Sequence, residues 1–144
     1  MNIYRVEKVT AKLVEAFEKL LPQLSAMLKC PTVNHIERVV GCDNTHLLVA
    51  EVDGAIVGML TLVLVDIPTS RKAWIEDVVT DDEYRGRGIG YALVERAKQI
   101  AVEEGACSLN LTSNPSRKAA HALYEKCGFS IYDTTLFRYN ILKK

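Results

Sequence analysis

The sequence lacks net charge, paired cysteines and any apolar run long enough to cross a membrane. Its 144 residues carry 18 basic and 18 acidic side chains, so no bulk field draws the chain to nucleic acid or to an anionic membrane. The longest apolar run, residues 55–65, is interrupted by Gly58 and Thr61, and the first residues lack the apolar core of a signal peptide. We therefore expect a soluble, cytoplasmic protein without a nucleic-acid or membrane partner.

The four cysteines are too scattered for a disulfide or metal framework. Cys30, Cys42, Cys107 and Cys127 form no CxxC pair and no Cys/His spacing of the kind that binds zinc. The pattern predicts reduced thiols, most of them packed in the interior, and no metal site.

Length and composition predict a single domain over residues 1–144. With 49% hydrophobic residues, the chain is long enough for one core and too short for two. Residue patterns predict the order β α α β β β α β α β β. The predicted strands are residues 2–9, 47–52, 55–65, 74–80, 107–112, 129–132 and 135–142. The predicted helices begin at Thr10, Thr32, Tyr91 and Lys118.

These elements predict an α/β (α+β) fold, in which a mixed, mostly antiparallel sheet of about seven strands is flanked by about four helices. The clearest hairpin surrounds Asp53 and Gly54, because this dipeptide supplies the positive φ angles of a type I′ turn. A loop is expected at residues 66–72. The third strand and the C-terminal strand leave edges that a homodimer could cover.

A glycine-rich loop links the strand at residues 74–80 to the following helix. Glycine at 86, 88 and 90 allows unusual φ angles and close approach of the backbone to a ligand. The start of a helix leaves backbone N–H groups without partners and carries the positive end of the helix dipole. With Arg85 and Arg87 beside it, the loop predicts an anion site, most naturally for phosphate.

Two common phosphate loops do not fit this segment. The dinucleotide fingerprint requires a glycine where the chain has Tyr91, and a P-loop requires Gly-Lys-Ser or Gly-Lys-Thr. What remains is Arg-x-x-Gly-x-Gly, formed by Arg85, Gly88 and Gly90. This motif resembles the acyl-CoA pyrophosphate loop of the GNAT superfamily of N-acyltransferases.

A second motif carries the same resemblance. Residues 118–129 form an alanine-rich segment that ends Leu-Tyr-Glu-Lys-Cys-Gly-Phe, similar to another signature of the superfamily. Its local sequence is most similar to that of the glucosamine-phosphate N-acetyltransferases. One departure is Arg117, which stands seven residues before Tyr124. Much of the family has an asparagine there, whose side-chain amide contacts the pantetheine arm. Asn114 is a weaker candidate for this contact.

The resemblance implies an acetyl-CoA-dependent N-acetyltransferase that acts on a primary amine, with a small molecule favoured, by direct transfer in a ternary complex. It implies that Tyr124 is the general acid for the leaving thiolate and that Glu76 takes the proton of the amine. In regular alternation Asp77 shares a face with Ile75 and Val79, and Glu76 lies on the opposite face. Only one of the two carboxylates can then face the substrate, and Glu76 is preferred. A peptide N-acetyltransferase and a non-catalytic acyl-CoA sensor are the alternatives.

The resemblance also implies which residues bind the cosubstrate acetyl-CoA. The backbone of residues 85–90 would hold the pyrophosphate, and the strand backbone would bind the pantetheine arm like an added strand. The implied residues are Val78, Val79, Arg85, Gly86, Arg87, Gly88, Ile89, Gly90, Asn114 and Arg117. Substrate selection is expected in residues 22–42, 66–72 and 132–135.

Overall fold

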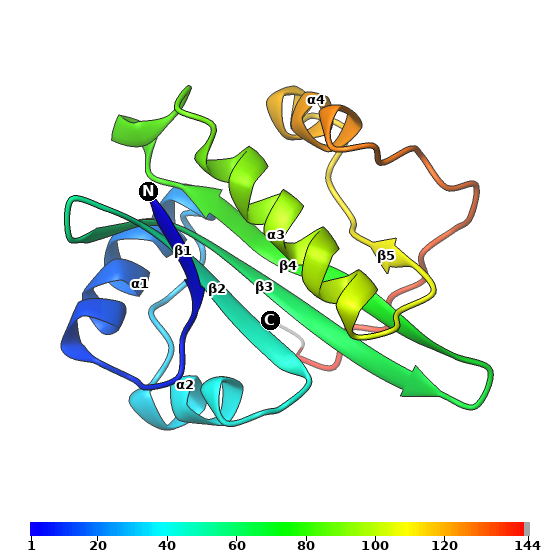
Figure 1. Cartoon of the computed structure of the whole chain (residues 1–144), viewed down its shortest axis with the longest axis horizontal. Coiled ribbons are helices and arrows are strands. Elements are labelled where there is room, and N and C mark those ends of the chain that lie inside the picture. Colours follow the sequence, from blue (N-terminus) through cyan, green and yellow to red (C-terminus); the bar gives the residue numbers. More distant parts are fainter. Residues whose placement is uncertain (143–144) are drawn as a thin grey trace.

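A computed structural model describes residues 1–142, which form a five-stranded sheet with helices on both faces (Figure 1). The strands follow the order β1-β2-β3-β4-β5; neighbours from β1 to β4 are antiparallel, and β4 and β5 are parallel. The strands are β1 (Asn2–Arg5), β2 (Thr45–Val52), β3 (Ala55–Ile67), β4 (Ser70–Thr80) and β5 (Leu109–Asn110). The helices are α1 (Ala11–Leu24), α2 (Val33–Val40), the 3₁₀ turn η1 (Asp82–Tyr84), α3 (Ile89–Glu103) and α4 (Lys118–Lys126).

The predicted α/β class and the hairpin are confirmed. Asp53 and Gly54 have φ angles of 50° and 81°, as a type I′ turn requires, and Val52 pairs with Ala55 across the turn. The loop expected at residues 66–72 is shorter, because β3 and β4 continue as a hairpin until Ile67 pairs with Ser70.

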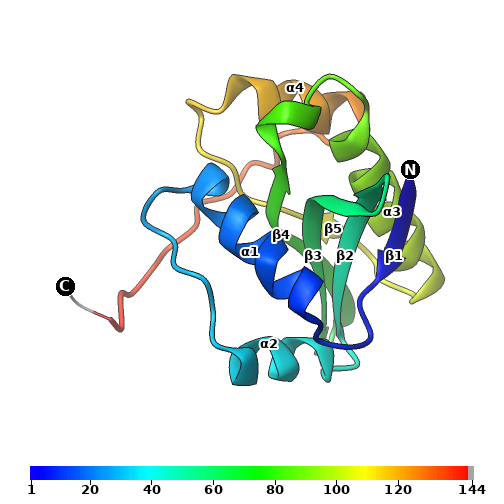
Figure 2. The same ribbon diagram turned by 90° about the vertical axis from the view of Figure 1, so that its left-hand side faces the viewer.

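Two apolar cores lie on opposite faces of the sheet, and α1 and α3 cover these opposite faces (Figures 1 and 2). One lies beneath α1 and α2, whose first turns are capped as predicted: Thr10 accepts from the Leu13 N–H and Thr32 from the His35 N–H, each at 3.2 Å. The other lies beneath α3, against which α4 contributes Leu123 and Tyr124. The sheet therefore separates an α1 side from an α3 side.

Gly58 on β3 lets the start of α3 lie close to the sheet. A Cβ atom at this position would lie 2.9 Å from Ile89 Cγ2 and 3.1 Å from Leu93 Cδ1, closer than packed carbon atoms approach. Any side chain at 58 would push α3 outward. This contact fixes the place of the loop that precedes the helix.

The expected closing strands are wrong for this structure. Residues 129–132 and 135–142 form no strand, and β5 is limited to Leu109–Asn110, so the described sheet has five strands and not about seven. Both strands were expected from local pattern, whereas a strand also needs a neighbouring edge with which to pair.

The expected burial of several side chains is also wrong. Cys30, Cys42 and Cys107 are free thiols but exposed, and Cys127 alone of the four is buried. Met27 is 86% exposed, because α1 ends at Leu24 and its apolar stripe loses the helical period there.

Within residues 1–142 no helix combines the length and the apolar character that a membrane crossing requires. In the same part of the chain no group of three or more His, Cys, Asp or Glu side chains is arranged to hold a metal ion.

Candidate functional site

A cavity of about 290 Å³ lies where β4 and β5 separate. The two parallel strands pair at Ala73 with Leu109 and at Trp74 with Asn110. Past these pairs, the cavity is bounded by β4, the segment after β5, the end of α1 and the start and middle of α4. Glu76, Val78, Arg117 and Tyr124, all predicted to be functional, line it together.

A β-bulge at Asp77 shapes the wall that β4 provides. Between Glu76 and Val79, β4 holds one residue more than β3 holds between the partners Thr61 and Met59. Asp77 has a φ angle of 52°, in the left-handed region that Asp enters more readily than most residues. Glu76 and Asp77 both line the cavity.

This bulge overturns the expectation that regular alternation allows only one carboxylate to face the substrate. Ile75 and Val79 should share a face in an unbroken strand, but Ile75 packs in the core on the α3 side and Val79 in the core on the α1 side. The extra residue shifts the alternation by one position. The bulge depends on pairing with β3, which the pattern of β4 alone does not reveal.

The environment of Glu76 makes its carboxyl group a better proton acceptor near neutral pH. Partial burial raises the pKa of Glu76, the neighbouring Asp77 carboxylate raises it further, and Arg138 from the C-terminal segment lowers it. The net shift is upward. A general base is most effective when its pKa approaches the working pH.

Tyr124 is held on α4 with its phenol in the cavity wall. Its ring packs edge to face against Phe129 with 6.0 Å between centroids, and its carbonyl accepts from the Phe129 N–H at 3.0 Å. Burial raises the pKa of Tyr124, although Arg117 opposes the shift. The phenol therefore keeps its proton throughout the neutral range and can donate it.

The glycine-rich loop has the backbone of an anion cradle. Gly86 and Gly88 have φ angles of 79° and 77°, and a Cβ at either would meet no atom within 4 Å, so open space lies beside the loop. Gly88 is the N-cap of α3, and no side chain caps the helix there. The N–H groups of the first turn of α3 are thus available to an anion.

The other loop residues have more varied roles than predicted. Gly90 has no positive φ angle; a Cβ there would lie 3.2 Å from Leu123 Cδ2, so its requirement is space against α4. Ile89 is buried in the α3-side core and can offer a ligand only its backbone. Arg85 pairs with Asp82 at 2.9 Å, and Arg87 lies 4.8 Å from the Tyr84 ring centroid; both arginines are exposed.

The remaining predicted cofactor contacts are divided between the cavity and its surroundings. Val78 lines the cavity, while the side chain of Val79 is buried in the α1-side core. Asn114 Oδ1 accepts from the N–H and the hydroxyl of Ser116 at 2.9 and 2.8 Å, which commits this oxygen to a local turn. Arg117 is the N-cap residue of α4 and lines the cavity, so it is better placed than Asn114.

The structure adds residues that the sequence did not single out. Leu24, Ser25 and Leu28 form the wall next to α1, within residues 22–42 where substrate selection was expected. Ser113 lines the opposite wall, and its hydroxyl is buried without a hydrogen-bond partner among the described residues. No motif marked Ser113, because its position depends on the separation of β4 and β5.

Asp81 ties the beginning of the glycine-rich loop to α1. The buried carboxylate lies 3.0 Å from Lys19 Nζ and accepts from the Glu83 N–H at 3.1 Å and from Gln23 Nε2 at 3.5 Å. Gln23 Oε1 in turn accepts from the Asp82 N–H at 2.7 Å. Because α1 also ends at the cavity, this network joins the cavity wall next to α1 to the glycine-rich loop.

Replacing Asp81 with asparagine should reduce the free energy of unfolding by about 1–3 kcal/mol, the cost of leaving buried polar partners unsatisfied. Burial raises the pKa of Asp81, but the hydrogen bonds from Lys19 and Glu83 outweigh it and hold the pKa below its usual range. The stabilisation is therefore present above the ordinary carboxyl pKa and is lost as pH falls through the lowered value.

Urea unfolding at neutral and acidic pH measures both effects. Asp82→Asn is the matched control, because its ion pair with Arg85 is exposed and contributes less than about 1 kcal/mol. If Asp81→Asn and the unaltered chain are equally stable at neutral pH, Asp81 does not stabilise the attachment of the glycine-rich loop to α1.

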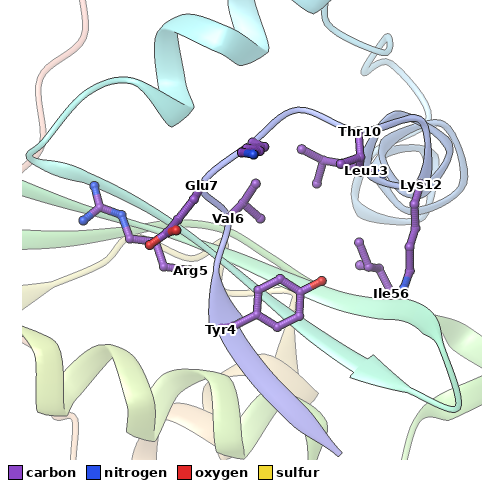
Figure 3. A pocket seen from close by; sticks show the side chains of 9 residues that line it. Tyr4, Arg5, Val6, Glu7, Thr10, Lys12, Leu13 and Ile56 are labelled. Carbon is purple, nitrogen blue, oxygen red and sulfur yellow. Dashed lines mark hydrogen bonds between the residues drawn. The ribbon is translucent and has the colours of Figure 1, made fainter.

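A second cavity, of about 320 Å³, lies between β1 and the start of α1, apart from these residues (Figure 3). Two of its charged groups already have protein partners: Arg5 donates to the carbonyls of Cys42, Asp43 and Thr45 at 3.2 Å, and Lys12 pairs with Glu51. We regard it as a surface hollow.

The comparison with protein families agrees with the geometry around β4 and α4. The model of the acetyltransferase (GNAT) family matches residues 13–129. The chain belongs to this family. The match includes the bulged strand, the glycine-rich loop and the Tyr124 helix, and it ends at Phe129.

Two curated acetyltransferases match over shorter stretches. The chain is 34% identical over 67 residues to streptothricin acetyltransferase of Escherichia coli, a stretch that covers 46% of this chain and 38% of the relative. It is 44% identical over 55 residues to the probable glucosamine 6-phosphate N-acetyltransferase 2 of Oryza sativa subsp. japonica, covering 38% and 31% of the two. The chain thus spans less than half the length of these curated relatives.

The fold as a whole resembles solved GNAT structures. The putative acetyltransferase from Agrobacterium tumefaciens str. C58 superimposes with a TM-score of 0.85 at 24% identity, covering 97% of this chain and 99% of that one. This likeness confirms the expected single-domain GNAT-like fold.

Proposed function

We propose that the chain is an acetyl-CoA-dependent N-acetyltransferase that acetylates a primary amine of a small molecule. The observation that supports this proposal most strongly is that Glu76 on β4 and Tyr124 on α4 line the same cavity. The strand that carries Glu76 leads directly to a loop with the backbone of a phosphate cradle. A proton acceptor and a proton donor thus line one cavity, and an anion site follows the strand that bears the acceptor.

Acetyl transfer from a thioester to an amine needs two proton movements. As the amine nitrogen attacks the carbonyl carbon, a C–N bond forms and Glu76 takes the amine proton, directly or through a water molecule. As the C–S bond breaks, Tyr124 gives its phenol proton to the departing thiolate. We assign polarisation of the carbonyl to a backbone N–H of Val78 or Val79. The reaction proceeds by direct transfer and needs no covalent enzyme intermediate.

The loop and the start of α4 would hold the cosubstrate. Open space lies beside Gly86 and Gly88, and backbone N–H groups of residues 85–90 would suit a pyrophosphate placed there. Arg117 in the cavity wall could contact either the pantetheine arm or a phosphate. Acetyl-CoA then supplies the acetyl group, while the chain positions it and moves the protons.

A small acceptor is favoured by the dimensions and charge of the cavity. Its volume of about 290 Å³ is at the lower end of ligand pockets, and two carboxylates in its wall attract a cationic amine. The named relatives include a streptothricin and a glucosamine 6-phosphate acetyltransferase, both with small-molecule substrates. A cytoplasmic location and the absence of a nucleic-acid or membrane partner stay predictions.

Release of free thiol from acetyl-CoA in the presence of a panel of amines tests this proposal. The panel should contain streptothricin, glucosamine 6-phosphate, an aminoglycoside, a polyamine and a peptide with a free N-terminus. We expect release with at least one small amine and none without an amine. Release with the peptide alone would favour the peptide transferase, and binding of acetyl-CoA without release with any amine would favour the sensor.

The pH dependence of kcat/KM should identify Glu76 as the base. Activity should rise with pH as Glu76 loses its proton. Asp77→Asn removes a charge that raises the pKa of Glu76, so the rise should move to lower pH; Arg138→Met removes a charge that lowers it, so the rise should move to higher pH. Glu76→Gln should lower the rate and abolish the rise of activity with pH. If activity rises with pH in the same way in the unaltered chain and in all three variants, Glu76 is not the base.

A further inference from the structure

Two polar side chains in the cavity wall that follows β5 have no partner within the part of the chain that the structure describes. Ser113 lies after β5, and its hydroxyl group is buried without a hydrogen bond. Arg117 is the N-cap residue of α4, and its side chain takes part in none of the ion pairs among residues 1–142. Both line the cavity together with Tyr124. A hydroxyl group and a guanidinium group in one cavity wall suit a negatively charged atom.

Arg117 and Tyr124 lie on the same side of α4. They are seven positions apart, which is close to two turns of a helix, and both line the cavity. Helical side chains lean toward the N-terminus of their helix, and this brings the Tyr124 ring toward Arg117. Burial and the Cys127 thiol raise the pKa of Tyr124, while Arg117 lowers it. The charge of Arg117 therefore acts at the phenol oxygen.

The positive charges that act on Glu76 and on Tyr124 come from different residues. The charged groups that shift the pKa of Glu76 are Asp77 and Arg138, whereas Arg117 shifts that of Tyr124. In the proposed reaction Glu76 acts at the amine and Tyr124 at the sulfur. Arg117 thus belongs to the side of the cavity where the thiolate leaves.

The phosphate cradle lies nearer the other end of α4. A Cβ at Gly90 would lie 3.2 Å from Leu123 Cδ2, and Lys126 Nζ lies 4.8 Å from the Tyr91 ring centroid. The C-terminal half of α4 therefore packs beside the start of α3. Arg117 precedes Leu123 by six positions, about 9 Å along a helix, so it is better placed for the inside of the cavity than for a phosphate at the loop.

We propose that Ser113 and Arg117 bind the sulfur atom of the cosubstrate and stabilise the thiolate as it leaves. As the C–S bond breaks, its electron pair stays on sulfur; the Ser113 hydroxyl donates a hydrogen bond to that atom, and Arg117 supplies the opposite charge. When Tyr124 passes its proton to the sulfur, the negative charge moves to the phenol oxygen, where Arg117 also acts. This inference rests on the proposed function and narrows the role of Arg117 to the sulfur, in place of the pantetheine arm or a phosphate.

Calorimetric titration with CoA, which ends in a free thiol, and with desulfo-CoA, which lacks the sulfur atom, tests this inference without any turnover. A site that favours the thiolate binds CoA more tightly as pH rises toward the pKa of the free thiol, ordinarily about 8.5 for a cysteine. Between about pH 7 and pH 9.5 we expect the affinity for CoA to rise about 10-fold more than that for desulfo-CoA, which corresponds to a bound thiol about ten times more acidic than the free one.

Four substitutions assign this sulfur-specific rise to the two side chains. Arg117→Met removes the charge and Ser113→Ala removes the hydroxyl group, so each should lose most of the rise. Arg117→Lys keeps a charge and should keep part of it, whereas Arg117→Asn offers an amide without a charge and should lose it. The matched control is Arg138→Met, which removes an exposed arginine whose charge acts on Glu76 and should leave the rise unchanged. Circular dichroism checks that each variant is folded.

The two ligands together separate failure of this inference from failure of the proposed function. If both bind and their affinities change with pH in the same way, the inference is overturned and the proposed function stands. Equal weakening of both ligands by Arg117→Met would show that Arg117 binds the pantetheine arm or a phosphate, which also overturns the inference. If neither ligand binds, the proposed function fails and the inference fails with it.

Discussion

Tyr124→Phe should lower kcat by about 100-fold or more, the usual contribution of a positioned general acid, while acetyl-CoA binds almost as tightly as before. The substitution removes only the hydroxyl group, so the packing of the ring against Phe129 and the fold should be kept. Without the phenol, the thiolate leaves unprotonated and the C–S bond breaks more slowly.

The pH profile separates an acid from a merely structural tyrosine. Because the pKa of Tyr124 is raised by burial, activity should decline only above the ordinary phenol value of about 10, and the Tyr124→Phe protein should lose this decline. Tyr4→Phe is the control, since Tyr4 lies in the other cavity. Unchanged turnover in Tyr124→Phe would remove Tyr124 from the acid role.

Gly88→Val should reduce the affinity for acetyl-CoA by about 100-fold, through backbone strain and loss of aligned N–H groups. Gly88 has a φ angle of 77° at the N-cap of α3, and a β-branched residue strongly disfavours that region. The valine side chain would also occupy the open space in which the pyrophosphate is expected.

Gly54→Val is a closely matched control for this loop variant. Gly54 has a φ angle of 81°, and a Cβ there also meets no atom within 4 Å, but it lies in the β2–β3 turn. Both variants should lose similar stability in urea unfolding, and only Gly88→Val should lose affinity in a calorimetric titration. Equal affinity in the two proteins would show that the loop does not bind the cosubstrate.

The sequence predicted best the features that depend on neighbouring residues. Asp53 and Gly54 determine their own turn, Thr10 and Thr32 cap their own helices, and α4 begins at Lys118 as predicted. These features need no partner from a distant part of the chain.

The features that the sequence failed to predict depend on long-range pairing. The bulge at Asp77 arises from the register between β3 and β4, so it could not be read from the alternation of β4. Ser113 reaches the cavity because β5 separates from β4. The C-terminal segment has a strand pattern, but within residues 1–142 it pairs with no strand of the sheet, so its predicted strands are absent.

Calorimetric titration of the purified protein with acetyl-CoA tests the central claim most directly, with CoA lacking the 3′-phosphate and NADH as comparators. We expect saturable binding of acetyl-CoA, weaker binding of the CoA without its 3′-phosphate, and no binding of NADH. Absence of acetyl-CoA binding would contradict the account, because it would mean that the glycine-rich loop is only a turn and that this chain has the GNAT fold without its cosubstrate.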